Sequence, residues 1–274
     1  MKINPVFKDT VGQRNAVTLL SESIASAKND GEMMSPFFAQ VAGGGKTHLL
    51  TRYLNGLKEV GVKTLFFSSP EEFREAGANW DSIINLITGN DRYAIGVDEA
   101  HLLENRKTIR LEKFKAFVMK ALDKNNHKRT FSLDGQTTCS FNRKKGVICF
   151  GTNFPDMLDK SGALQSRFDL LELEAYSTDQ LVDILQGMLV EAGFQAANEE
   201  TLARIARCGR GTARPMEKII GQIKMSRSAS GDKKKTINRE DVLQALLLKR
   251  MFPRGLTEHE IQMLNVCEVP RRDS

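Results

Sequence analysis

One short stretch, FFAQVAGGGKTHLL at residues 37–50, constrains the fold more than any other part of the chain. Its first apolar residues predict the end of a buried strand, and apolar residues at helical spacing follow from His48 onward. Between them stand Gly43, Gly44 and Gly45, although glycine weakens helices and strands because it loses the most backbone freedom on folding. Alone, this run also fits a flexible turn. A strand, a glycine turn, Lys-Thr and a helix in succession instead predict a phosphate-binding loop.

In a loop of this kind each residue type has a chemical task. Backbone amides of the turn and of the helix N-terminus face phosphate oxygens. Lys46 would contact the β and γ phosphates, and the Thr47 hydroxyl would bind Mg²⁺. The usual pattern G-x-x-x-x-G-K-[ST] has glycine where this chain has Gln40, whereas the later glycines and the Lys-Thr pair are intact. This departure bears on the entry of the loop and on nucleotide affinity more than on the existence of the site.

Composition and charge place few limits on partners. The chain has 274 residues, of which 41% are apolar and 27% charged, as in a globular protein with a substantial core. Its net charge of +6 permits a polyanionic partner without demanding one. The four cysteines are scattered without a C-x-x-C pair, which favours free thiols in a reducing compartment. Without an apolar run of roughly 18 residues or a signal-peptide core, we expect a cytoplasmic protein with no membrane partner.

Apolar strand patterns alternate with helical patterns through the first part of the chain. This alternation predicts an α/β domain with a mostly parallel sheet and helices on both faces. Asp134-Gly135 is a two-residue turn signal and predicts a β-hairpin at 129–141. The expected strands lie at about 36–40, 62–69, 92–101 and 146–153. The expected helices lie at 13–28, from the loop to 60, and at 71–77, 80–88 and 107–123.

After about residue 175 the pattern becomes helical, with no convincing strand. We expect a domain at 1–174, a small all-helical domain at 175–250 and a short tail at 251–274. The biased tract at 224–236 is interpreted as an exposed loop. The expected helices of this part are 178–193, 199–208, 213–227 and 238–250.

An acidic pair supplies the second half of the candidate site. Asp98 and Glu99 follow the apolar strand at 93–97, and such strand ends face the ligand crevice of an open α/β sheet. Asp98 would hold the water shell of Mg²⁺ beside Thr47, and Glu99 would orient and polarise the attacking water. Together the two motifs predict that the chain binds and hydrolyses ATP with Mg²⁺.

Five further segments carry a resemblance that covers about residues 4–262. They are DTVGQ at 9–13, VDEAHLL at 97–103, GTN at 151–153, ALQSRFDL at 163–170 and GRGTARPMEKII at 209–220. With these segments the chain resembles an AAA+ ATPase, and within that class the RuvB-type Holliday-junction branch-migration motors. The resemblance implies a P-loop NTPase domain followed by a helical lid, with ATP and Mg²⁺ as cofactors.

The resemblance also implies roles for individual residues. Val11 would lie beside the adenine, His48 would join the loop in binding the nucleotide, and Asn153 would place the lytic water. Arg167 would reach the γ-phosphate of a neighbouring subunit, and Arg214 would act on the nucleotide from the lid. Other interpretations are a surface ion pair for either arginine and a strand-end cap for Asn153. His101 is interpreted as a packing or supporting residue and left out of the chemistry.

The hairpin at 129–141 falls where RuvB-type motors carry a partner-contacting hairpin. Phe131, Leu133 and Phe141 alternate with polar residues, which fits a half-buried hairpin and an exposed docking knob equally well. Basic runs at 124–129 and 142–146 flank it and are either solvated or in contact with phosphates.

Three functions follow from these patterns. The first is an ATP-driven homo-oligomeric ring, expected to be hexameric, that moves DNA together with a protein partner. The second is an ATPase that loads or remodels a protein on DNA. This second function is favoured because the sequence ends at Ser274, about where RuvB-type proteins begin a winged-helix domain that binds DNA. The third, suggested by Gln40, is a nucleotide-gated assembly switch that turns over slowly.

Overall fold

The structure is a computed structural model of the chain. It describes residues 3–40, 42–73, 78–105, 109–121, 129–132, 138–141, 144–153, 167–252, 255–256 and 260–263. The chain divides into two compact units, which are described separately. The α/β unit comprises Met1–Val41 and Gly45–Glu174, and the helical unit comprises Ala175–Ser274 together with the loop residues Ala42–Gly44.

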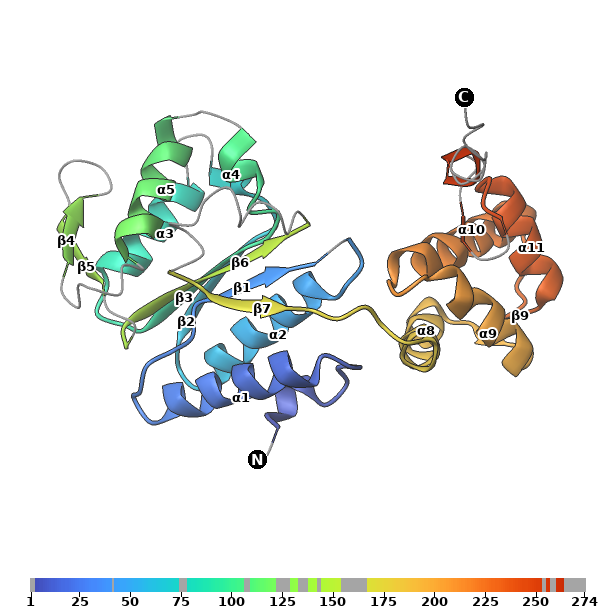
Figure 1. The fold of residues 1–274 in the computed structure, drawn as a ribbon, viewed down its shortest axis with the longest axis horizontal. Helices are drawn as coiled ribbons and strands as arrows, with labels where there is room; N and C mark the ends of the chain where they lie inside the picture. Colours follow the sequence, from blue (N-terminus) through green and yellow to red (C-terminus); the bar gives the residue numbers. More distant parts are fainter. Residues whose placement is uncertain are drawn as a thin grey trace, which may run out of the picture. The chain divides into compact units, whose positions relative to one another are not determined.

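A five-stranded sheet forms the centre of the α/β unit, in the order β2-β3-β6-β1-β7 (Figure 1). All of its neighbouring strands pair in parallel, so the predicted α/β fold with a parallel sheet is confirmed. β1, β3 and β6 are buried along their whole length, as expected for continuous apolar runs covered on both faces. The strands are β1 (Pro36–Ala39), β2 (Lys63–Phe67), β3 (Tyr93–Val97), β6 (Gly146–Thr152) and β7 (Asp169–Glu172).

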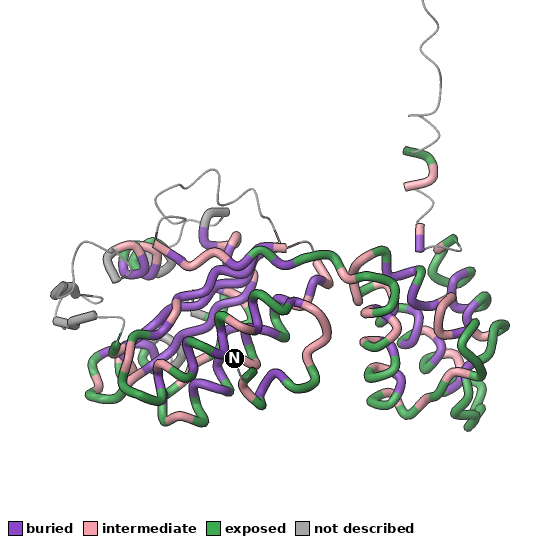
Figure 2. The backbone as a smooth tube through the Cα atoms, turned by 60° about the horizontal axis from the view of Figure 1, so that its bottom comes forward, coloured by how far each residue is buried: buried purple, intermediate pink, exposed green. Residues whose placement is uncertain are grey.

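Helices cover both faces of this sheet (Figure 1). Successive side chains of a strand point to opposite faces, so the adjacent, fully buried Phe37 and Phe38 of β1 belong to two different core clusters. Phe38 packs in the cluster of α1 (Arg14–Lys28) and α2 (Lys46–Glu59), which also receives the short helix η1 (Pro5–Phe7). Phe37 packs in the cluster of α3 (Ala78–Thr88) and α5 (Ile109–Ala121). Figure 2 shows the buried strands between more exposed helices.

In the helical unit, α8 to α11 pack around a third core cluster, which includes the fully buried Leu185, Ile205 and Ile219. Local capping signals fix where these helices begin, because side-chain oxygens accept hydrogen bonds from otherwise unpaired amides. Ser177 and Asn238 each form a capping box with the residue three positions later. The helices are α8 (Thr178–Ala192), α9 (Glu199–Cys208), α10 (Arg214–Ser230) and α11 (Arg239–Leu248).

Several expectations about local structure are wrong. The helical unit does contain strands, because β8 (Gln195–Ala196) and β9 (Thr236–Ile237) pair in parallel over two residues each. The tract at 224–236 is not all loop, since α10 continues to Ser230 and buries Arg227. β7 and the short helix α4 (Leu102–Asn105) were also not expected from the sequence. The short helix η2 (Pro70–Phe73) overlaps the start of the helix expected at 71–77, and residues 74–77 of that segment lie outside the described residues.

The predicted hairpin is present as an antiparallel pair of β4 (Arg129–Ser132) and β5 (Thr138–Phe141). Its turn at 133–137, with Leu133, lies outside the described residues, and so do the basic segments at 124–128 and 142–143. The exposed docking knob therefore stays a prediction. Among the described residues, no helix has the length and apolar character needed to cross a membrane.

Candidate nucleotide-binding site

The glycine loop connects the end of β1 to the start of α2. Gly43 and Gly45 have φ angles of 87° and 88°, in the left-handed region where a side chain is strained. Gly45 is the N-cap of α2, and its carbonyl accepts the amide of Leu49 at 3.0 Å, the first turn of the helix. The turn before Lys46 therefore requires glycine at two of the three consecutive positions, because only glycine adopts these φ angles without strain.

Lys46 begins α2 and is 5% exposed. Its Nζ donates a hydrogen bond of 2.7 Å to the carbonyl oxygen of Gln40, the residue that directly follows β1. A buried ammonium group is stabilised by anionic or dipolar partners, so this placement fits a loop that receives phosphate.

Thr47 and Asp98 meet at the edge of the sheet where the parallel strands end. The Thr47 hydroxyl donates to one carboxylate oxygen of Asp98, and the other oxygen accepts the Glu99 amide at 2.8 Å. Asp98 is 6% exposed and lies against Gly151 of β6, where an added Cβ would stand 2.6 Å from its Oδ1. A hydroxyl and a carboxylate are the oxygen ligands that Mg²⁺ accepts, so these residues fit that ion.

Glu99 has a φ of 50° and lies beside Asn153, which directly follows β6. The Asn153 side-chain amide donates to both carboxylate oxygens of Glu99, at 2.6 and 2.7 Å. His101 is also present, with Nδ1 3.3 Å from Glu99 Oε2. The sequence analysis left His101 out of the chemistry. Its position two residues after Glu99, in the turn that follows β3, was the one signal that its side chain could lie beside the Glu99 carboxylate.

The other residues singled out from the sequence are more scattered. Arg167 is half-buried, and its Nε donates to the carbonyl of Met119 in α5 at 2.9 Å. His48 lies in the first turn of α2, with Nε2 3.3 Å from the Thr10 hydroxyl oxygen, and Val11 follows Thr10 in the half-buried N-terminal segment. The structure therefore brings His48 to the segment that holds Val11.

Arg214 lies in the helical unit as the exposed first residue of α10. The amide of the preceding Ala213 donates to the carbonyl of Gly43 at 3.0 Å, and both residues belong to that unit. The Tyr176 hydroxyl also donates, at 3.4 Å, to the carbonyl of Gly44. The carbonyls of Gly43 and Gly44 thus accept hydrogen bonds from Ala213 and Tyr176, which places Gly43 next to Arg214.

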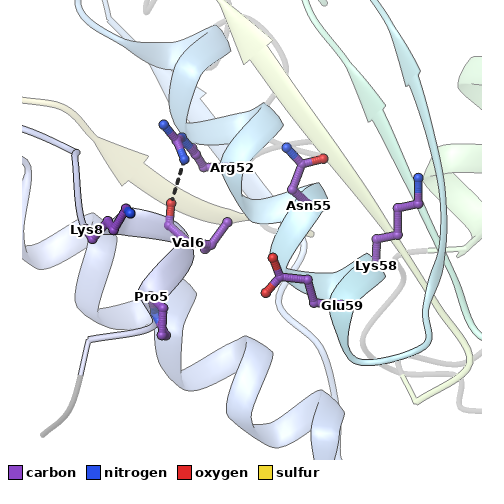
Figure 3. Close-up of a pocket in the computed structure, with 7 residues that line it drawn as sticks. All are labelled: Pro5, Val6, Lys8, Arg52, Asn55, Lys58 and Glu59. Carbon is purple, nitrogen blue, oxygen red and sulfur yellow. Dashed lines mark hydrogen bonds between the residues drawn. The ribbon is translucent and has the colours of Figure 1, made fainter. Parts of the chain in front are cut away.

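A surface cavity of about 550 Å³ lies elsewhere on α2, against η1 (Figure 3). It is lined by the C-terminal half of α2, including Arg52, whose Nη1 donates to the Val6 carbonyl at 3.2 Å. The loop residues begin α2 at its other end, so this cavity is separate from the candidate site. Within the described ranges, no three His, Cys, Asp or Glu side chains form a metal cage.

The sheet order, the glycine loop and the acidic strand end together define an AAA+ P-loop NTPase fold, which comparison with solved structures supports. RuvB of Thermotoga maritima, described as a Holliday junction branch migration motor, is similar with a TM-score of 0.68 and 20% identity. That likeness covers 93% of this chain and 76% of RuvB.

The AAA domain of FIGL-1, solved in complex with ADP, is similar with a TM-score of 0.63 and 15% identity over 97% of this chain and 91% of that one. No protein-family profile and no curated protein matches the sequence. At these identities the likeness establishes the RuvB-like AAA+ fold, and the function is argued from the site.

Proposed function

We propose that the chain is a Mg²⁺-dependent ATPase. One observation carries the proposal: residues that follow three neighbouring strands, β1, β3 and β6, meet in one place. Thr47 bonds to Asp98, and Asn153 bonds to Glu99, beside a glycine loop that holds the buried Lys46. Phosphoryl transfer depends mostly on positioning and charge stabilisation, and these groups supply both.

Each side chain has a defined task in this proposal. The loop amides and Lys46 would bind the phosphates, and Thr47 and Asp98 would hold Mg²⁺, which would supply positive charge beside the phosphates. Glu99 orients the attacking water and accepts its proton, and Asn153 fixes the position of Glu99. Val11 and His48 would lie on the nucleoside side of the site.

We further propose that the active form is a homo-oligomeric ring, hexameric as in the sequence-based expectation, that acts on DNA with a protein partner. Arg167 would complete the site of the neighbouring subunit and Arg214 would contact the nucleotide from the helical unit. The likeness to RuvB, a Holliday junction branch migration motor, supports DNA as the polymer. A partner would dock on the β4–β5 hairpin.

ATP turnover with and without DNA tests this proposal. A DNA motor should hydrolyse ATP several-fold faster with branched or duplex DNA, whereas a loader should respond mainly to its protein partner. Mixing Arg167→Ala subunits with Glu99→Gln subunits should restore some activity, because both groups are intact wherever an Arg167→Ala subunit holds the nucleotide and its Glu99→Gln neighbour supplies the arginine. Absence of nucleotide binding by the unmodified chain would refute the ATPase assignment.

One observation favours the slow, nucleotide-gated switch as a second candidate. Both oxygens of Glu99 accept hydrogen bonds from Asn153, which occupies part of the accepting capacity of the base and holds it in one orientation. A switch would assemble on binding ATP and hydrolyse it hardly at all, even with DNA present. Single-turnover kinetics separate this behaviour from that of a motor.

A further inference from the structure

Gln40, which replaces the first glycine of the usual loop pattern, has contacts that a glycine lacks. β1 lies between β6 and β7 (Figure 1), and its last residue, Ala39, is in register with Thr152 on one side and Glu172 on the other. The Gln40 amide continues the pairing with β6 by donating to the Thr152 carbonyl at 3.4 Å.

Towards β7, the side chain of Gln40 makes the hydrogen bond to the neighbouring chain segment. Its Nε2 donates to the carbonyl of Leu173, the residue that follows β7. The same residue binds Lys46 through its carbonyl oxygen at 2.7 Å. Gln40 therefore joins the lysine of the loop to the chain segment that leaves the sheet.

A second glutamine holds the next residue of that segment. Gln13 is 8% exposed and has a left-handed φ of 54°. Its Nε2 donates to the Glu174 carbonyl at 2.7 Å, and its Oε1 accepts the Glu174 amide at 3.0 Å. These paired bonds imitate one rung of a β-ladder, with a side chain in place of a strand.

Leu173 and Glu174 are the last residues of the α/β unit before the chain enters the helical unit at Ala175. Both are thus fastened by glutamines from the two segments that flank the nucleotide site, the glycine loop and the N-terminal segment. We propose that Gln40 and Gln13 are positioning residues, here called the glutamine clamp, that couple occupation of the loop to the segment 173–174.

The coupling follows from the bonds of Gln40 and rests on the proposed nucleotide binding. When Lys46 turns to a phosphate it gives up the Gln40 carbonyl, which loosens one of the contacts that fix Gln40. Any shift of Gln40 is passed through its side chain to Leu173, and so to the start of the helical unit. With glycine at this position the side-chain bond would be lost.

Hydrogen–deuterium exchange of residues 173–176 tests the clamp, together with binding of a fluorescent ATP analogue. Gln40→Met and Gln13→Met keep side-chain length but remove the amide. Gln195→Met, which removes an exposed bond to Thr236 in the helical unit, is the matched control. Without nucleotide, we expect exchange in 173–176 to rise about tenfold in the two clamp variants and to stay unchanged in the control.

The nucleotide-dependent part separates coupling from a merely structural role. Adding Mg²⁺ and the analogue should change exchange at 173–176 in the parent, and Gln40→Met should lose more than half of that change while still binding the analogue. An equal change in parent and Gln40→Met would overturn the coupling, and unaltered exchange in both variants without nucleotide would overturn the clamp. If the parent binds no analogue, the proposed function fails and the coupling with it, while nucleotide-free exchange still decides whether the clamp exists.

Discussion

Gly151→Ala is expected to displace the carboxylate that holds Mg²⁺. In the structure an added Cβ would stand 2.6 Å from Asp98 Oδ1, whereas ordinary contacts begin at 3.4 Å. The carboxylate must therefore retreat by about 0.8 Å or the strands must separate. Because its two oxygens bind the Thr47 hydroxyl and the Glu99 amide, this movement disturbs both halves of the site.

The size of the effect follows from these contacts. Overpacking a buried position costs about 1–3 kcal/mol of folding stability, and a misplacement near 1 Å can cost about 100-fold in rate. We expect unfolding by urea to show a loss of about 2 kcal/mol. The Mg²⁺ concentration for half-maximal ATP turnover should rise about tenfold, which corresponds to about 1.4 kcal/mol of metal binding.

Gly96→Ala is the matched control for this change. There an added Cβ would also stand 2.6 Å from its nearest neighbour, but that neighbour is the terminal methyl group of Leu54 in the core. The control should lose stability and keep the parental Mg²⁺ dependence. If Gly151→Ala also keeps that dependence and its full turnover, the argument that Asp98 is positioned by the absence of a side chain at 151 is refuted.

Three further predictions concern the base and the helical unit. Glu99→Gln should still bind nucleotide but lose about 100-fold or more of turnover, and hydrolysis at the parental rate would contradict its role as base. Arg227→Met should lower the unfolding free energy measured in urea by about 3 kcal/mol, because Asp241 and two backbone carbonyls lose their hydrogen bonds from the buried guanidinium. Arg204→Met removes an exposed ion pair with Glu200 and should cost under about 0.5 kcal/mol. Equal losses in the two variants would refute the argument. Gly221→Ala, at an exposed position of α10 where the new Cβ would meet no atom within 4 Å apart from neighbouring backbone of its own helix, should raise the unfolding free energy by about 0.5–1 kcal/mol, and a loss would count against it.

Much of the fold could be predicted from the sequence because its signals are local. The strands β1, β3 and β6 are continuous apolar runs, and the glycines before Lys46 mark a turn that few other residues can form. Thr47 and Asp98 could be placed near each other because both follow parallel strands that end at the same edge of the sheet. The roles of the site residues stay predictions.

What sequence reasoning missed depends on contacts between distant positions. β7 is four residues long with a mixed burial pattern, so its identity as a strand comes from its pairing with β1. The bond of Gln40 to Leu173 joins positions 133 residues apart and leaves no local trace. The end of α10 was misassigned because its last three residues, 228–230, are small and exposed and carry no apolar periodicity, while Ile223 and Arg227 before them are buried.

The most direct test of the central claim is a crystal structure of the chain with Mg²⁺ and a slowly hydrolysed ATP analogue. The account predicts phosphates on the loop amides of residues 43–47, Lys46 turned from Gln40 to the phosphates, and the metal between Thr47 and Asp98. An analogue bound elsewhere, or a loop without nucleotide at saturating analogue, would contradict it.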